Sequence, residues 1–305
     1  MKRLFSFLLL LISTLVRAQV PKVSSGSIQR LEAFPSKYVD ARNIDVWLPD
    51  GYPAAGTYAV LYMHDGQMLF DSTITWNRQE WRVDETAGRL QREGLTIPFI
   101  VVAIPNHPKY RFAEYFPSIA AKVMSVNLTR IDSLRIELQG RVRSFYYMKF
   151  LTEELKPYID RHFATYTDAA HTFIAGSSMG GLISLYGFTE YPKVFGGAAC
   201  LSTHWPGSLK RFSGTETNFP YIKEYVGLRL KKPGKRRLYF DRGDRTLDSF
   251  YAPFQPVIDS IAKKREYGSR NYRTLVFPGA DHSERAWAAR LEEPLLFLFG
   301  RRKDQ

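Results

Sequence analysis

A serine between two glycines is the residue of this 305-residue chain best suited to nucleophilic chemistry. Residues 176–180 read Gly-Ser-Ser-Met-Gly, so Ser178 stands at the centre of a G-x-S-x-G pattern. A strand-like apolar segment, residues 172–175, precedes it, and a helix-like segment, residues 179–191, follows it. Glycines admit the sharp strand-to-helix turn that raises a serine hydroxyl above a sheet edge. The pattern predicts Ser178 as a nucleophile at a helix N-terminus, where partial positive charge favours an oxyanion.

A serine hydroxyl needs a base, and the base needs an orienting acid. Of six histidines, only His282 follows the last predicted strand, and Gly279 lets its loop bend back towards Ser178. We therefore predict His282 as the base.

The acid is expected after the preceding strand, residues 237–240, where Asp241, Asp244 and Asp248 follow. Asp241 ends that strand, Asp244 could shape a turn beside Gly243, and Asp248 could cap the next helix. Spacing favours Asp248 and leaves the other two open.

Two backbone N–H groups are needed to hold a developing oxyanion. The residue after the nucleophile, Met179, is expected to supply one. The second is expected from the turn after residues 58–64, where Gly66 would aim the N–H of Gln67 inward.

Strand-like and helix-like segments alternate along the chain. The expected strands are residues 43–49, 58–64, 97–104, 172–175, 195–201, 237–240 and 273–277, and the expected helices are residues 145–162, 179–191, 249–267 and 283–299. This order predicts a mainly parallel sheet with helices on both faces, in one domain from about residue 24 to 302. Residues 107–145 fit the alternation poorly and are expected to form an insertion near the site.

The first 18 residues have the features of a secretory signal peptide. Lys2 and Arg3 are basic, residues 4–16 are apolar, and Ala18 stands at the expected cleavage point. The apolar segment is shorter than the roughly 20 residues that span a bilayer. We therefore expect a secreted or periplasmic protein without stable membrane insertion.

The formal net charge is +13, and the densest basic cluster lies at residues 231–237, around Pro233 and Gly234. Its cations lack interleaved aromatic residues, which predicts a solvated loop rather than a nucleic-acid site, although the charge would suit anionic substrates or surfaces. The single cysteine, Cys200, excludes a disulfide framework and is expected in the core. No His, Asp and Glu residues have metal-ligand spacing, and no pattern specifies an oligomeric state.

Several runs together resemble the esterase D and enterochelin-esterase-like group of α/β-hydrolases, over roughly residues 40–300. They are HDGQ at residues 64–67, GSSMGG at 176–181 and GADH at 279–282, with further likeness at 76–85 and 111–117. This group also contains feruloyl and acetylxylan esterases, S-formylglutathione hydrolases and mycolyltransferases. The resemblance implies an α/β-hydrolase fold, Asp248 in the acid position, and neither a metal nor an organic cofactor.

The expected function is that of a serine carboxylic-ester hydrolase. Acetyl or feruloyl esters of carbohydrates, or siderophore esters, are the expected substrates; an acyltransferase with the same triad and a non-catalytic binding protein are the alternatives. Aromatic rings stack on sugars and feruloyl groups, and an arginine would suit a charged siderophore. Six residues are therefore predicted to contact substrate: Trp76, Trp81, Arg111, Tyr115, His204 and Trp205.

Overall fold

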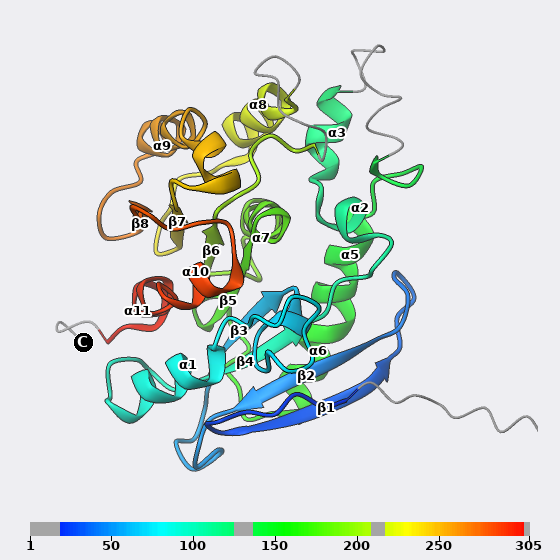
Figure 1. Ribbon diagram of the computed structural model, residues 1–305, viewed down its shortest axis with the longest axis vertical. Coiled ribbons are helices and arrows are strands. Elements are labelled where there is room, and N and C mark those ends of the chain that lie inside the picture. Colours follow the sequence, from blue (N-terminus) through cyan, green and yellow to red (C-terminus); the bar gives the residue numbers. More distant parts are fainter. Residues whose placement is uncertain (1–18, 125–136, 209–216, 302–305) are drawn as a thin grey trace, which may run out of the picture.

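A computed structural model describes residues 19–124, 137–208 and 217–301. Within them, eight strands form one sheet in the order β1-β2-β4-β3-β5-β6-β7-β8 (Figure 1). The strands are β1 (Ser27–Phe34), β2 (Arg42–Leu48), β3 (Ala59–His64), β4 (Phe99–Ile104), β5 (Thr172–Ser177), β6 (Gly197–Leu201), β7 (Arg237–Arg242) and β8 (Tyr272–Val276). The pairs β1–β2 and β2–β4 are antiparallel and every other neighbouring pair is parallel. The expected mainly parallel sheet is confirmed.

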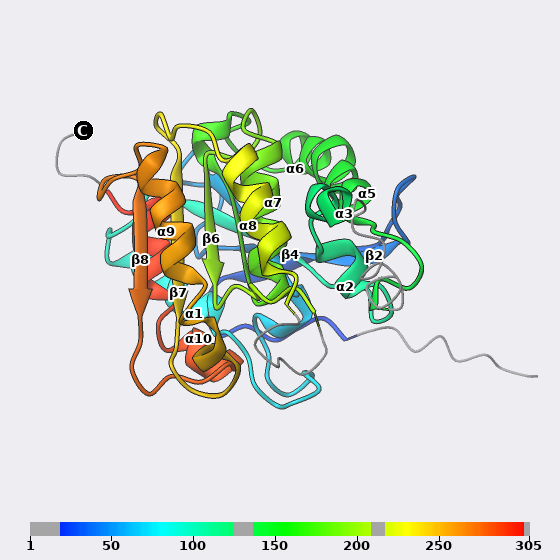
Figure 2. The ribbon, with the colours of Figure 1, turned by 90° about the horizontal axis from the view of Figure 1, so that it is seen from above.

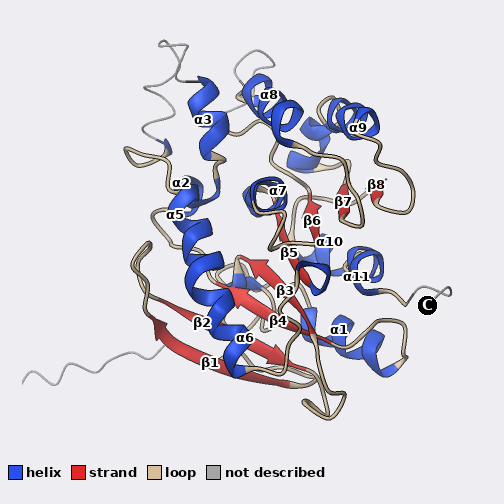
Figure 3. Ribbon diagram, turned by 180° about the vertical axis from the view of Figure 1, so that it is seen from behind, coloured by secondary structure: helices blue, strands red, loops and turns tan. Residues whose placement is uncertain are grey.

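Helices cover both faces of this sheet (Figures 1 and 3). On one face lie α1 (Val83–Arg92), α10 (Glu284–Ala288) and α11 (Glu292–Phe299). The other face carries α2 (Arg111–Tyr115), α3 (Ser118–Met124), α5 (Ser144–Lys149), α6 (Lys156–His162), α7 (Met179–Glu190), α8 (Phe219–Arg229) and α9 (Gln255–Lys264). The short helices are η1 (Gly66–Met68), η3 (Phe150–Leu155), η4 (Ala169–His171) and η5 (Thr246–Tyr251).

Alternate side chains of the central strands enter two separate cores. In β3, Val60 and Tyr62 pack in one hydrophobic cluster, whereas Leu61 and Met63 pack in the other. Because both faces are buried, the strand is a continuous apolar run rather than an alternating one. This explains why the sequence indicates these strands so clearly.

The structure departs from the expected elements mainly at the edges and at helix ends. The edge strand β1 was not expected, because its side chains are mostly partly or fully exposed and carry little apolar signal. The expected helix at residues 249–267 is divided into η5 and α9, and α9 begins with Pro256 in its first turn. The expected helix at residues 283–299 is likewise divided into α10 and α11. Helices α1 and α8 were also missed.

Parallel strands bring their carboxyl ends to one edge of the sheet, which Figure 2 shows as the edge near α10, towards which β6, β7 and β8 point. At this edge the turn after β3 packs closely on β4. A Cβ atom on Gly66 would lie 2.5 Å from the backbone nitrogen of Ile104 and 2.6 Å from the carbonyl carbon of Ala103. Both are backbone atoms, so a side chain at position 66 would displace η1.

We expect Gly66→Ala to lower the free energy of unfolding by roughly 1–3 kcal/mol, the usual effect of overpacking, because the added side chain would displace η1. Gly227→Ala is the matched control. Nothing lies within 4 Å of a Cβ at that position of α8, and alanine should stabilise a helix by about 0.5–1 kcal/mol. Denaturant unfolding of both variants checks this, and an unchanged midpoint for Gly66→Ala would contradict it.

Candidate active site

Ser178 occupies a strained turn between β5 and α7. Its backbone angles are φ 58° and ψ −121°, a combination that residues other than glycine rarely adopt. Two backbone hydrogen bonds hold the turn: the Ser178 N–H donates to the carbonyl of Leu201 (3.0 Å), and the His204 N–H donates to the carbonyl of Ser178 (3.1 Å). A Cβ on Gly176 would lie 2.9 Å from the backbone of Gly180, so this turn requires glycine there.

His282, in the loop after β8, contacts one of the three candidate acids. Its Nδ1 lies 2.6 Å from Oδ1 of Asp248, a fully buried residue of η5. The His282 N–H donates to Thr246 Oγ1 (2.9 Å), which holds the two loops together. Asp244 instead accepts a hydrogen bond from the Gly279 N–H (2.8 Å), and Asp241 lies beside Arg290 (3.2 Å). The structure therefore brings together His282 and Asp248.

Asp248 is held by a buried polar network. Its Oδ2 accepts hydrogen bonds from Ser202 Oγ (2.6 Å) and from the Gly243 N–H (2.5 Å). Ser202 Oγ in turn accepts from Trp287 Nε1 (2.9 Å) and Arg290 Nη2 (2.8 Å). A buried carboxylate is costly unless it is hydrogen-bonded and its charge is balanced. Arg290, 3.7 Å from Asp248 Oδ2, supplies that balance.

Tyr251, which no sequence motif marks, also lies at this edge. The Tyr251 ring packs edge-on against His282, with centroids 5.8 Å apart, and its hydroxyl interacts with the Ser178 side chain. Through that ring, Ser178 and His282 share the same edge of the sheet. Tyr251 lies in η5, three residues after Asp248. Its contacts with Ser178 and His282 depend on how η5 and these two segments meet in the fold.

The two hydrogen-bond partners of His204 indicate which of its ring nitrogens carries the proton. Its Nε2 lies 2.9 Å from the carbonyl oxygen of Ser208, so Nε2 carries the proton. Burial lowers the pKa of His204 to about 4, so the ring is neutral near pH 7 and Nδ1 is an acceptor. The Tyr251 hydroxyl, 2.8 Å away, therefore donates to Nδ1. This leaves the oxygen of Tyr251 to accept a hydrogen bond at the side of Ser178.

The turn expected to form the second half of an oxyanion site lies beside the start of α7. A Cβ on Gly180 would come 3.3 Å from Asp65 Oδ2. The Asp65 carboxylate accepts two hydrogen bonds from Arg111 (both 2.7 Å) and one from Asn106 (2.6 Å). Burial alone would raise the pKa of Asp65, but the Arg111 guanidinium outweighs it and holds that pKa below its usual value. Arg111 therefore balances the negative charge of Asp65 near the N-terminus of α7. An unbalanced carboxylate there would repel an oxyanion formed at Ser178.

A family model described as "Putative esterase" matches residues 39–298. This chain belongs to that family. The match covers most of the chain and includes the turn at residue 178 and the loop at residue 282. The chain is accordingly a carboxylic-ester hydrolase.

Relatives of this esterase are distant. It is 21% identical to the uncharacterized protein YbbA of Bacillus subtilis over 270 residues, which are 86% of this chain and 94% of YbbA. It is 27% identical to an endo-1,4-beta-xylanase/feruloyl esterase of Xylanibacter ruminicola over 62% of this chain, but spans only 23% of that enzyme.

Solved structures show the same fold. The enterobactin esterase FES from Shigella flexneri matches with a TM-score of 0.65 at 15% identity, over 91% of this chain and 61% of FES. A CE1 ferulic acid esterase from Anaeromyces mucronatus matches with a TM-score of 0.60 at 18% identity, over 92% of this chain and 93% of that one. The α/β-hydrolase fold of this esterase is confirmed.

The six residues expected to contact substrate lie in different surroundings. Trp76 is 83% exposed, and Arg111 is partly exposed while paired with Asp65. The other four are at most 5% exposed: Trp81, Tyr115, His204 and Trp205. These four side chains expose almost no surface, and their contact with substrate stays a prediction.

These four residues support the site from within the core. Trp81 packs on Trp287 (centroids 5.2 Å apart), the tryptophan that contacts His282. Trp205 Nε1 donates to Gln255 (3.0 Å). The Tyr115 hydroxyl accepts from the Asp65 N–H (3.3 Å) and so steadies the turn before Gln67, whose side chain is exposed.

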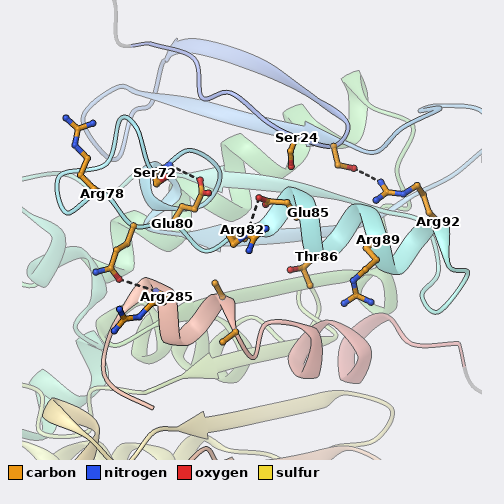
Figure 4. Close-up of a pocket in the computed structure, with 14 residues that line it drawn as sticks. Ser24, Ser72, Arg78, Glu80, Arg82, Glu85, Thr86, Arg89, Arg92 and Arg285 are labelled. Carbon is orange, nitrogen blue, oxygen red and sulfur yellow. Dashed lines mark hydrogen bonds and ion pairs between the residues drawn. The ribbon is translucent and has the colours of Figure 1, made fainter. Parts of the chain in front are cut away.

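A cavity of about 780 Å³ lies between α1, the preceding loop and α10 (Figure 4). Five arginines line it together with Glu80 and Glu85. Much of its charge is paired, as in Arg82 with Glu85 (3.2 Å), while Arg89 and Arg92 pair with acids outside the lining. The described residues include no group of three or more His, Cys, Asp or Glu that could hold a metal ion. In that same part of the chain, no helix is long and apolar enough to cross a membrane.

Two buried histidines make the folded protein sensitive to acid. Burial lowers the pKa of His64 to about 3 and that of His204 to about 4, whereas an unfolded histidine titrates near 6.5. Between about pH 6.5 and 4 the unfolded chain therefore binds about two more protons. We expect the free energy of unfolding to be unaffected by these groups above pH 6.5, and to fall on acidification by roughly 2–3 kcal/mol per pH unit.

Urea unfolding between pH 7 and pH 4.5 measures this slope. His204→Gln should remove about half of it, because one proton fewer is taken up. His162→Gln, at an exposed position of α6, should leave it unchanged. Equal slopes in the wild type and His204→Gln would contradict the prediction.

Proposed function

We propose that this esterase cleaves its substrate through Ser178, His282 and Asp248 by way of an acyl-enzyme. The observation that carries the proposal is the 2.6 Å contact between His282 Nδ1 and the buried Asp248, at the edge where the strained Ser178 lies. A carboxylate on Nδ1 fixes the imidazole tautomer and leaves Nε2 to take a proton. That is the arrangement a serine nucleophile needs.

In the proposed reaction, His282 takes the proton of Ser178 as Ser178 Oγ attacks the ester carbonyl. The backbone N–H groups of Met179 and Gln67 stabilise the oxyanion, with support from the N-terminus of α7. Protonated His282 then gives its proton to the departing alcohol. Water, activated by His282, cleaves the acyl-enzyme and releases the acid. Asp248 stabilises the cationic form of His282 in both halves.

We further propose that the substrates are acetyl or feruloyl esters of carbohydrates, or siderophore esters. The names of the similar proteins support this class, since they include a feruloyl esterase, a ferulic acid esterase and an enterobactin esterase. Exposed apolar side chains also flank Asp248: Leu247 is 39% and Phe250 is 49% exposed. With Trp76, these side chains provide surfaces on which an aromatic acyl group or a sugar ring can stack.

Activity on a panel of acetylated and feruloylated sugars and a catecholate siderophore ester tests the proposal. Ser178→Ala should lower kcat at least about 1000-fold and abolish labelling by a fluorophosphonate, and Asp248→Asn should lower kcat roughly 100- to 10,000-fold because the imidazole tautomer is lost. Asp244→Asn is the matched control, because its remaining oxygen still accepts from Gly279. Wild-type activity in Ser178→Ala, or equal losses in the two Asn variants, would refute the triad.

We also propose that the protein is exported. The predicted signal peptide, residues 1–18, lies outside the described residues, and its support is the sequence pattern alone. N-terminal sequencing of protein recovered from the periplasm or medium should begin at Gln19. Protein found only inside the cell and beginning at Met1 would contradict this.

A further inference from the structure

Tyr251 lies between two imidazole rings at the carboxyl edge of the sheet. It is fully buried. Its ring meets those of His204 and His282 edge-on, at interplanar angles of 85° and 78°, with centroids 5.8 Å apart in both cases. Its hydroxyl lies 2.8 Å from His204 Nδ1 and forms a second hydrogen bond with the Ser178 side chain. The phenol oxygen therefore stands between a supporting histidine and the proposed nucleophile.

The direction of these two hydrogen bonds follows from the carbonyl oxygen of Ser208, which can only accept. His204 Nε2 lies 2.9 Å from that oxygen, so Nε2 carries the proton of the neutral ring and Nδ1 is an acceptor. Burial raises the pKa of Tyr251 well above its usual value, so its hydroxyl stays protonated and donates to Nδ1. A phenol has one proton. Towards Ser178, the Tyr251 oxygen can therefore only accept.

His204 holds both ends of this chain of hydrogen bonds. Its ring accepts from Tyr251, and its backbone N–H donates to the carbonyl oxygen of Ser178 (3.1 Å). The Gly207 N–H donates to the carbonyl oxygen of His204 (3.1 Å) and closes the turn that carries the imidazole. One short segment after β6 thus positions the acceptor on Tyr251 relative to Ser178.

Acylation of Ser178 removes the proton that Tyr251 accepts, an argument that rests on the acyl-enzyme of the proposed function. In the free enzyme, the Ser178 hydroxyl can donate to Tyr251 or to His282. In the acyl-enzyme the same oxygen belongs to an ester and donates to neither. A buried acceptor without a donor destabilises that state. A molecule that enters next with two O–H groups can satisfy His282 and Tyr251 together.

We propose that Tyr251 orients the water that cleaves the acyl-enzyme and thereby favours hydrolysis over transfer of the acyl group to an alcohol. The water donates one O–H to His282 Nε2 and the other to the Tyr251 oxygen while its own oxygen attacks the acyl carbon. Its first proton passes to His282 and then to Ser178 Oγ, as the bond between Oγ and the acyl carbon breaks. The carboxylic acid leaves, and the Ser178 hydroxyl is restored as a donor to Tyr251.

An alcohol has a single O–H, which it must give to His282. The Tyr251 oxygen then stays unpaired in a buried site. Sites that are built to hydrogen-bond a hydroxyl discriminate against a ligand that lacks it, because their polar groups are left without partners. His204 acts through Tyr251 and is a positioning residue, since it keeps the tyrosine proton away from the incoming water.

Competition between water and methanol for one acyl-enzyme tests the proposal. A nitrophenyl acyl ester is turned over by the full-length protein in dilute methanol, and the free acid and the methyl ester are separated and measured. Both products come from the same acyl-enzyme, so their ratio does not depend on how much of a variant is folded. Tyr251→Phe removes the acceptor, and His204→Leu releases the tyrosine proton.

Tyr267→Phe is the matched control. This tyrosine is also buried, and its hydroxyl has no hydrogen-bond partner among the described residues. Its ring packs on Tyr272 at the start of β8, the opposite edge of the sheet (centroids 5.9 Å apart). The substitution therefore deletes a buried phenol oxygen without touching the proposed site.

The ratio of methyl ester to free acid should rise about 5-fold or more in Tyr251→Phe, because water loses a hydrogen bond that methanol never makes. It should also rise in His204→Leu. Tyr267→Phe should change it by about 2-fold or less, since separated sites act independently. An unchanged ratio in Tyr251→Phe or in His204→Leu, or an equal rise in Tyr267→Phe, would overturn the proposal.

The same experiment separates the role of Tyr251 from the acyl-enzyme itself. Mass spectrometry of wild-type protein quenched during turnover should show an acyl adduct on Ser178, and methyl ester should form. If neither is found, the acyl-enzyme is refuted and the role of Tyr251 with it. An acyl-enzyme whose product ratio is insensitive to Tyr251→Phe would overturn the role of Tyr251 alone.

Discussion

The edge of the sheet at which Ser178 and His282 lie depends on one buried charge, the carboxylate of Asp248. It has no exposed surface, and it is stabilised by His282, Ser202, the Gly243 N–H and nearby Arg290. These partners come from the segments that directly follow β6, β7 and β8. A buried carboxylate tolerates little displacement of its partners. Water cannot replace a lost hydrogen bond there, so the unpaired group destabilises the fold. The requirement to satisfy Asp248 therefore fixes how the last three strands and α10 meet.

A second buried charge, the carboxylate of Asp65, is balanced by Arg111 near the N-terminus of α7. Asp65 lies in a left-handed conformation (φ 55°) at the start of η1, close to the N-terminus of α7. An unpaired carboxylate there would oppose an oxyanion, and Arg111 prevents this while pinning the turn. The strained backbone of Ser178 is held by backbone hydrogen bonds with Leu201, the last residue of β6, and with His204 in the segment after it. The strained conformation of Ser178 is thus supported by the sheet beside it.

The parallel sheet brings distant segments of the chain together at each of its two edges. At the carboxyl edge, the strands end in segments that carry Ser178, His282 and Asp248, the proposed nucleophile, base and acid. At the amino edge, backbone hydrogen bonds join the starts of the same strands, as in Arg237 N–H to Gly196 O and Leu238 N–H to Asn271 O (both 2.9 Å). Both results follow from parallel pairing, which brings like ends together regardless of the sequence distance between them.

By itself, the sequence determined the local features of this protein. Residues 172–190 show an apolar strand, glycines and a helix, because a strand-to-helix turn is encoded within about ten residues. The continuous apolar runs of the central strands reveal burial on both faces. Only the tertiary structure decided which aspartate meets His282, that Trp81, Tyr115 and Trp205 are core residues, and that Tyr251 and Arg290 lie beside His282 and Asp248. Those contacts join residues that are far apart in the chain or on different elements. Spacing along the chain specifies neither how loops from different strands converge nor which side chains the packing covers.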